Sequence, residues 1–210
     1  MKYDFDKQVN RRGTGSLKWD VPENELPMWV ADMDFETVPQ VKEALAARVA
    51  QGIYGYSILP DEWSKSYVDW WKKRHGLDLD PEKLIFVTGI VPAISSAVRK
   101  LTTPAENVLV QTPTYNIFFN SIYNNGRNIV ENKLLYDGER YRVDWGKLEE
   151  QLSDPQTTLM ILCNPHNPIG KIWDKETLAR VGELCSKYDV TVLSDEIHCD
   201  LTAPGREYVP

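Results

Sequence analysis

Short apolar runs alternate with helical segments through most of the chain, and this alternation constrains the fold more than any other feature. The runs at residues 84–87, 107–110, 128–130, 158–162 and 190–193 are rich in Val, Ile and Leu. Helical patterns separate them, which is typical of βαβ units and a parallel sheet. Because several runs are apolar throughout, both faces of the sheet should be covered. The sequence therefore predicts an α/β fold with a mainly parallel sheet between two helical layers.

The first 36 residues lack this pattern and are expected to form an irregular, extended arm. Glycines and prolines punctuate this segment, including Gly13, Gly15, Pro22 and Pro27. A helical pattern begins at Thr37. We therefore expect residues 1–36 to form an N-terminal arm and the start of a small domain, and residues 37–210 to form the N-terminal part of a larger α/β domain.

Composition and charge exclude several classes of protein. Asp and Glu number 31 against 24 Lys and Arg, a net charge of −7, which does not suit binding to a nucleic acid backbone. No stretch approaches the roughly 20 apolar residues of a membrane helix, and the N-terminus does not resemble a signal peptide. The three cysteines show no metal-ligand spacing, which favours reduced thiols in a cytoplasmic protein.

Clusters of polar residues, glycine and proline follow four of the predicted strands. They lie at residues 88–92, 112–115, 164–170 and 194–198. Consecutive parallel strands place their carboxyl ends at one edge of a sheet, and open α/β sheets bind ligands there. We therefore expect all four clusters to face one crevice.

Three of the clusters offer a group suited to a phosphate or a flat ligand. Ile90 and Val91 open a predicted helix, so their N–H groups suit a phosphate, although an ordinary turn would have the same sequence. Tyr115 could stand over a flat ring or pack in the core. Asp195 follows an apolar strand, where a buried acid must be paired or neutralised; a helix N-cap is the alternative.

The segment from Asn164 to Gly170 contains two Asn-Pro steps, which fix a backbone and aim side chains. Asn167 is the ligand candidate, whereas Asn164 is expected to stabilise its own turn and His166 to face solvent. His198 follows Asp195 by three residues, so a helix there would place both on one face. The chain has no Ser-His-Asp order and no His-Glu-x-x-His motif to support a hydrolase or a zinc enzyme.

Together these motifs resemble pyridoxal 5′-phosphate (PLP) enzymes of fold type I, the aminotransferase class I/II superfamily. The segment Asn-Pro-His-Asn-Pro-Ile-Gly, followed by an Asp at a strand end, is typical of that group. Within it, residues 32–35 (Asp-Met-Asp-Phe), 55–57 (Gly-Tyr-Ser) and 194–198 (Ser-Asp-Glu-Ile-His) resemble the bacterial carbon–sulfur β-lyase subgroup, which includes cystathionine β-lyases.

The resemblance implies that PLP is the cofactor and that two parts of the chain hold its phosphate. The backbone N–H groups of Ile90 and Val91 would donate to it. Tyr56 would reach across the interface of a homodimer to the cofactor phosphate of the partner subunit.

The same resemblance assigns four side chains to the cofactor ring. Tyr115 would stack on it, and Asn167 would bond to its hydroxyl group, with His198 near the same oxygen. Asp195 would pair with the protonated ring nitrogen, which is the partner expected for an electron-sink cofactor.

The implied reaction cleaves cysteine-S-conjugates, which are small amino-acid substrates, to a thiol, pyruvate and ammonia. The family's Schiff-base lysine and substrate-binding arginine would lie beyond Pro210, so no catalytic residue is expected in this chain. The chain would correspond to the N-terminal part of the family fold and be inactive alone. An aminotransferase acting on amino acids and a non-catalytic binding or regulatory remnant are the alternatives.

Overall fold

The computed structural model describes residues 3–210, which divide into two compact units that meet between Ile58 and Leu59. The first unit consists of the predicted irregular arm and helix α1 (Pro39–Gln51). Charge holds the arm together, because the Asp34 carboxylate accepts hydrogen bonds from Arg11 and Lys18 at 2.8 Å and from the Trp19 ring N–H at 2.7 Å.

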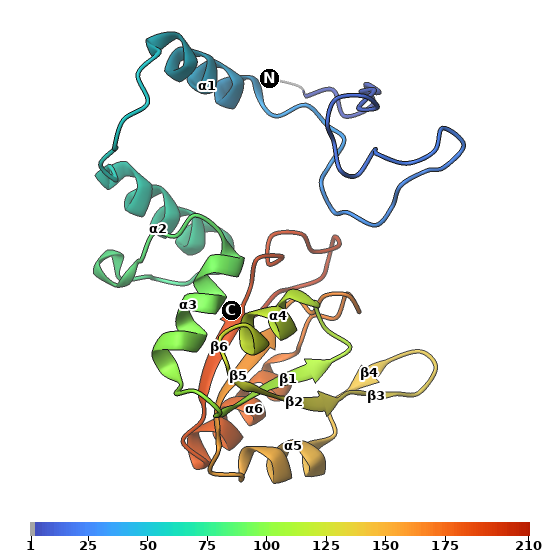
Figure 1. Cartoon of the computed structure of the whole chain (residues 1–210), viewed down its shortest axis with the longest axis vertical. Helices are drawn as coiled ribbons and strands as arrows, with labels where there is room; N and C mark the ends of the chain where they lie inside the picture. Colours follow the sequence, from blue (N-terminus) through green and yellow to red (C-terminus); the bar gives the residue numbers. More distant parts are fainter. Residues whose placement is uncertain (1–2) are drawn as a thin grey trace. The chain divides into compact units, whose positions relative to one another are not determined.

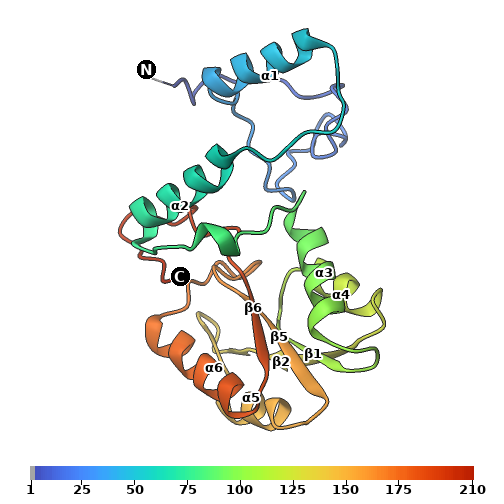
Figure 2. The same cartoon turned by 90° about the vertical axis from the view of Figure 1, so that its left-hand side faces the viewer.

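The second unit is a parallel sheet between two layers of helices, which confirms the predicted α/β class. The strand order is β2-β1-β5-β6 and all neighbours are parallel. Helices α3 and α4 cover one face, and α5 and α6 cover the other (Figures 1 and 2). The bounds are α3 Ile90–Leu101, β1 Asn107–Thr112, α4 Ile117–Tyr123, β2 Asn128–Lys133, α5 Trp145–Leu152, β5 Thr157–Cys163, α6 Lys175–Lys187 and β6 Thr191–Asp195.

Shorter elements complete this unit. Helix α2 (Asp61–His75) and a 3-10 turn (Pro81–Lys83) precede α3, and a two-stranded hairpin, β3 (Leu135–Tyr136) with β4 (Tyr141–Arg142), follows β2. Within residues 3–210, no helix has the length and apolarity that crossing a membrane requires.

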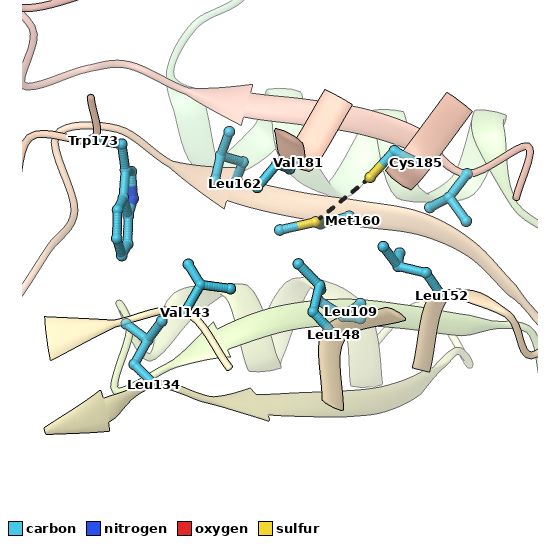
Figure 3. Close-up of a cluster of buried hydrophobic side chains, with 11 residues drawn as sticks. Leu109, Leu134, Val143, Leu148, Leu152, Met160, Leu162, Trp173, Val181 and Cys185 are labelled. Atoms are coloured by element: carbon cyan, nitrogen blue, oxygen red, sulfur yellow. Dashed lines mark hydrogen bonds between the residues drawn. The ribbon is translucent and has the colours of Figure 1, made fainter. Parts of the chain in front are cut away.

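The central strands bury both faces, as their apolar sequences predict. In β1, Val108 and Val110 pack under α3 and α4, whereas Leu109 points to α5 and α6, and all three are fully buried. Figure 3 shows the buried cluster between the sheet and helices α5 and α6. In it, Met160 of β5 contacts Cys185 of α6, with their sulfur atoms 3.8 Å apart. This alternation fixes which side chains near the strand ends face each helical layer.

Aspartate residues cap the N-termini of α5 and α6, the two helices on one face of the sheet. The Asp144 carboxylate accepts from the Lys147 N–H at 3.0 Å, and the Asp174 carboxylate accepts from the Thr177 N–H at 2.7 Å. Each satisfies an N–H that the first turn of a helix leaves unpaired, so α5 and α6 begin where the sequence provides a cap.

The prediction of a strand at residues 84–87 is wrong for this structure. The segment is extended but is not paired with any strand in the described chain, and Ile85 and Phe86 are exposed. A strand needs a neighbour to satisfy its N–H and C=O groups, and local apolarity cannot supply one.

Candidate functional site

Three strands of the sheet end at one edge, and each is followed by candidate ligand-binding residues. Strand β1 leads to Tyr115, β5 leads to the turn at residues 164–170, and β6 ends at Asp195. Cys163 and Asp195 are paired neighbours in the β5–β6 ladder, and the Asn164 N–H donates to the Asp195 carbonyl at 2.9 Å. The parallel topology thus gathers residues about 80 positions apart at one edge.

An open cavity of about 770 Å³ runs along α3 and β6, from Leu101 at the end of the helix to Ile90 and Asp195 near this edge. Its lining is mostly apolar and includes Ile90, Ile94 and Leu193, together with the Asp195 carboxylate. The first intrahelical bond of α3 runs from the Ala93 N–H to the Gly89 carbonyl, so the N–H groups of Ile90 and Val91 have no acceptor within the helix. The structure thus brings the start of α3 and Asp195 to one cavity.

Asp195 is a buried acid without a cationic partner. Its residue is 8% exposed, one carboxylate oxygen accepts from the Ile197 N–H at 3.2 Å, and no Lys, Arg or His within residues 3–210 forms an ion pair with it. Burial raises the pKa of Asp195 above its usual 3.8, while the Ile197 N–H and the nearby His198 act to lower it. A cation brought into the cavity would relieve this burial cost.

Tyr115 and Asn167 flank the same edge from neighbouring turns. The Tyr115 ring is 37% exposed and meets Phe118 edge to face, with ring centroids 5.8 Å apart. Asn167 is half-buried, and its backbone N–H reaches the Cys163 sulfur at 3.4 Å. Since the side chain of Cys163 lies on the α3 face with Leu193, the Asn167 backbone is anchored on the face that carries Asp195.

The structure contradicts two expectations for the turn at residues 164–170. His166 does not face solvent: it is 1% exposed, and its Nε2 lies 2.9 Å from the Pro113 carbonyl oxygen. Asn164 does not stabilise its own turn. Its side chain binds two segments outside the turn instead, because it accepts from the Trp173 N–H and donates to the Val209 carbonyl. A polar loop sequence did not reveal that both side chains would be enclosed by distant segments.

Two further predicted site residues, His198 and Tyr56, lie in a turn near Asp195 and in the first unit, respectively. Residues 196–210 contain no helix, so His198 lies half-buried in a turn rather than on a helical face shared with Asp195. Tyr56 belongs to the first unit, where its side chain is fully exposed in the loop after α1.

A polar cluster that sequence reasoning missed ties α2 to the turn after β6. The Asp200 carboxylate accepts from the Trp70 ring N–H at 2.9 Å and lies 3.1 Å from His75 Nε2. The side chains of His75, Cys199 and Asp200 also bring three potential metal-binding atoms within 4.8 Å of one another. Because Trp70, Arg74 and His75 already occupy the carboxylate, hydrogen bonding accounts for this cluster.

Comparison with known proteins agrees with this architecture. The chain matches the family Aminotransferase class I and II over residues 24–209. The chain belongs to this family. The match covers the arm from residue 24 onward and the whole sheet, so the edge that carries Asp195 and Asn167 lies inside the shared region.

Individual relatives show how much of the family fold is represented. The chain is 46% identical to cystathionine beta-lyase PatB of Bacillus subtilis, over 98% of this chain and 55% of PatB. Cystalysin from Treponema denticola, whose structure contains PLP, superposes with a TM-score of 0.94 at 36% identity, over 100% of this chain and 55% of cystalysin. A PLP-bound C–S lyase from Staphylococcus hominis gives a TM-score of 0.91 at 32% identity, with the same coverage. The chain therefore spans about half the length of these relatives.

The buried charge of Asp195 predicts that its removal changes the stability of the folded chain. Because burial raises this pKa, the native state is penalised at pH values above it, and the penalty disappears as the pH falls toward the usual range of an aspartate. We expect Asp195→Asn to raise the free energy of unfolding of the cofactor-free chain at pH 7.5, and to lose this advantage near pH 4. Urea unfolding of the wild type and of Asp195→Asn at both pH values measures this difference in the free energy of unfolding.

Asp189→Asn is the matched control, because Asp189 is exposed just before the opposite end of β6 and adopts a positive φ of 57° that Asn tolerates. It should show no such pH-dependent gain. An Asp195→Asn variant less stable than the wild type at pH 7.5 would contradict the interpretation.

Proposed function

We propose that this chain forms part of a PLP-dependent carbon–sulfur β-lyase of the cystathionine β-lyase type. The substrates would be cysteine-S-conjugates, and the products a thiol, pyruvate and ammonia. The buried, unpaired Asp195 carboxylate carries the proposal, because it lies in a cavity at the ligand-binding edge of a parallel sheet. The similarity to PatB, cystalysin and the S. hominis C–S lyase supports the reaction class.

The residues at the sheet edge fit the chemical groups of PLP. The free N–H groups of Ile90 and Val91 suit the phosphate, since a helix N-terminus attracts anions. Tyr115, which is partly exposed, offers a face for the ring, and the side-chain amide of Asn167 offers a donor for the ring hydroxyl oxygen, with His198 close by. We assign these roles as hypotheses for this chain.

Asp195 has the role on which the reaction rate depends. PLP supplies an electron sink for the negative charge that develops when the substrate loses its α-proton. The Asp195 carboxylate would hold a proton on the ring nitrogen, and its burial strengthens that interaction because little water competes. Ile90, Ile94 and Leu193 give the cavity around this residue a mostly apolar lining.

We also propose a homodimer, in which Tyr56 contacts the cofactor phosphate of the partner subunit, and a cytoplasmic location. The fully exposed Tyr56 ring and the free, buried cysteines are consistent with these proposals. We further propose that residues 1–36 form the arm that leads into a small domain, and that residues 37–210 contribute to the PLP-binding domain.

The reaction class is tested with a chimera in which this chain replaces the matching segment of PatB, whose remaining residues complete the fold. We expect the PLP-loaded chimera to release pyruvate from cystathionine with an equal amount of homocysteine, and to transfer amino groups to 2-oxo acids at least about tenfold more slowly. Faster amino-group transfer than pyruvate release would favour an aminotransferase. A chimera that binds PLP and performs neither reaction would favour a non-catalytic role.

A further inference from the structure

Two turns that carry proposed cofactor residues extend past the last paired positions of strands β1 and β5. The β1–β5 ladder runs to the pair Val110–Ile161. Beyond it, one strand continues to Pro113 and Tyr115, and the other to His166 and Asn167. Their spacing must therefore be set by contacts other than this ladder.

The His166 side chain makes such a contact. Its Nε2 lies 2.9 Å from the Pro113 carbonyl oxygen, and a carbonyl can only accept, so Nε2 carries the proton. Pro113 is two residues from Tyr115, and His166 is adjacent to Asn167. One hydrogen bond thus links the turn that presents Tyr115 to the turn that presents Asn167.

The surroundings of His166 hold its ring rigidly. Its backbone N–H donates to the Lys171 carbonyl at 2.7 Å, and its carbonyl accepts from the Gly170 N–H at 2.8 Å, which closes the turn. The ring meets Trp173 edge to face, with centroids 5.7 Å apart. The Trp173 ring N–H in turn donates to the Cys163 carbonyl at 3.1 Å, at the end of β5. The imidazole is therefore anchored to the strand from which its own turn emerges.

Burial of the imidazole affects its pKa. Burial lowers the pKa of His166, while the carbonyl groups of Pro113 and Gln111 act in the opposite direction. Within residues 3–210, no carboxylate forms an ion pair with this ring. Burial thus favours the neutral imidazole, in which Nε2–H can donate to the Pro113 carbonyl.

We propose that His166 is a positioning residue whose Nε2–H bond to Pro113 sets the spacing between Tyr115 and Asn167. The role of these two residues as the cofactor-ring contacts rests on the proposed function, whereas the coupling of the two turns does not. Among the described residues, His166 does not line the cavity that contains Asp195; its ring packs against Trp173, which belongs to the buried cluster on the α5–α6 face.

The test compares His166→Leu with His166→Gln in the PatB chimera. Leucine removes the donor, whereas the glutamine amide can place an N–H near the position of Nε2. Thr102→Val is the matched control. Thr102 is buried, and its hydroxyl oxygen accepts a hydrogen bond from Arg127 at 2.8 Å. It precedes the amino end of β1, so it lies away from the edge where the cofactor is proposed to bind.

Two readouts separate positioning from general stability. Hydrogen exchange by mass spectrometry should show faster exchange at residues 114–118 and 167–171 in His166→Leu, but not in Thr102→Val. Titration of the cofactor-free chimera with PLP should show about tenfold weaker binding for His166→Leu, with His166→Gln within about threefold of wild type and Thr102→Val unchanged.

The outcomes distinguish this proposal from the proposed function. Unchanged exchange at both turns in a folded His166→Leu chimera would overturn the coupling, as would equal losses of PLP affinity in His166→Leu and Thr102→Val. If His166→Gln failed to restore slow exchange, the hydrogen bond would not be the cause. If exchange changed as expected but wild type bound no PLP, the coupling would stand and the cofactor assignment would fail.

Discussion

Asp195→Asn should lower the lyase turnover of the PatB chimera by roughly 10²–10³-fold or more while PLP remains bound. Removing one member of a partly buried charge pair typically costs about 3–5 kcal/mol, and a loss confined to the transition state gives this range of rates. Asparagine is nearly isosteric and can still accept from the Ile197 N–H, so the turn after β6 should survive. Steady-state pyruvate release and cofactor absorbance after gel filtration measure the two quantities.

Two further variants show whether the loss belongs to the charge at this position. Asn167→Ala should cost less than Asp195→Asn, because it removes a neutral hydrogen bond to a group that other residues also hold. Asp189→Asn makes the same chemical change outside the site and should leave turnover within about twofold. Near-normal turnover of Asp195→Asn, with turnover abolished in Asn167→Ala, would refute the assignment.

The 210-residue chain alone should show no lyase turnover, whereas the chimera should be active. We propose that no lysine of this chain is the covalent anchor of the cofactor. Of the lysines after the Asn164–Gly170 turn, Lys171 lies 5.1 Å from the Trp173 ring, and Lys175 is exposed at the start of α6. Without a covalent anchor and general base, the cofactor cradle cannot complete the reaction.

Borohydride reduction with PLP, followed by peptide mass spectrometry, checks this expectation. The label should appear on one lysine of the PatB-derived part of the chimera, and on no single lysine of the chain alone. Among the lysines of this chain, Lys100 needs particular attention in the peptide analysis, because it belongs to α3 and lines the cavity that contains Asp195. Pyruvate release by the chain alone, together with a specific label on Lys100, would contradict the prediction.

The parallel sheet was predictable because its strands need only their own apolar residues and the helices next to them in the chain. Fully buried Leu109 and Met160 are examples, since each packs against helices within the described residues. The segment at 84–87 has equally apolar residues and formed no strand, because pairing depends on a neighbour that local sequence does not contain. Without such a neighbour, Ile85 and Phe86 are also exposed, so an apolar run alone predicts neither pairing nor burial.

The sheet edge was predictable in outline, but its supporting contacts were not. Asp195 stood out because a carboxylate at the end of an apolar strand is costly, and it is indeed buried. His166 gave no such signal: a histidine between prolines in a polar turn is typical of a solvent-facing residue. Its burial depends on Pro113 and Trp173, which lie 53 residues before it and seven after it.

The most direct test of the central role of Asp195 replaces the ring nitrogen of the cofactor by a CH group. In the wild-type chimera this 1-deaza analogue should lower turnover about as much as Asp195→Asn does, because both remove the same interaction. In the Asp195→Asn chimera the analogue should cause almost no further loss, which is the signature of two coupled groups in a double-mutant cycle. If the two losses multiplied instead, Asp195 would act through something other than the ring nitrogen, and the account of this site would be wrong.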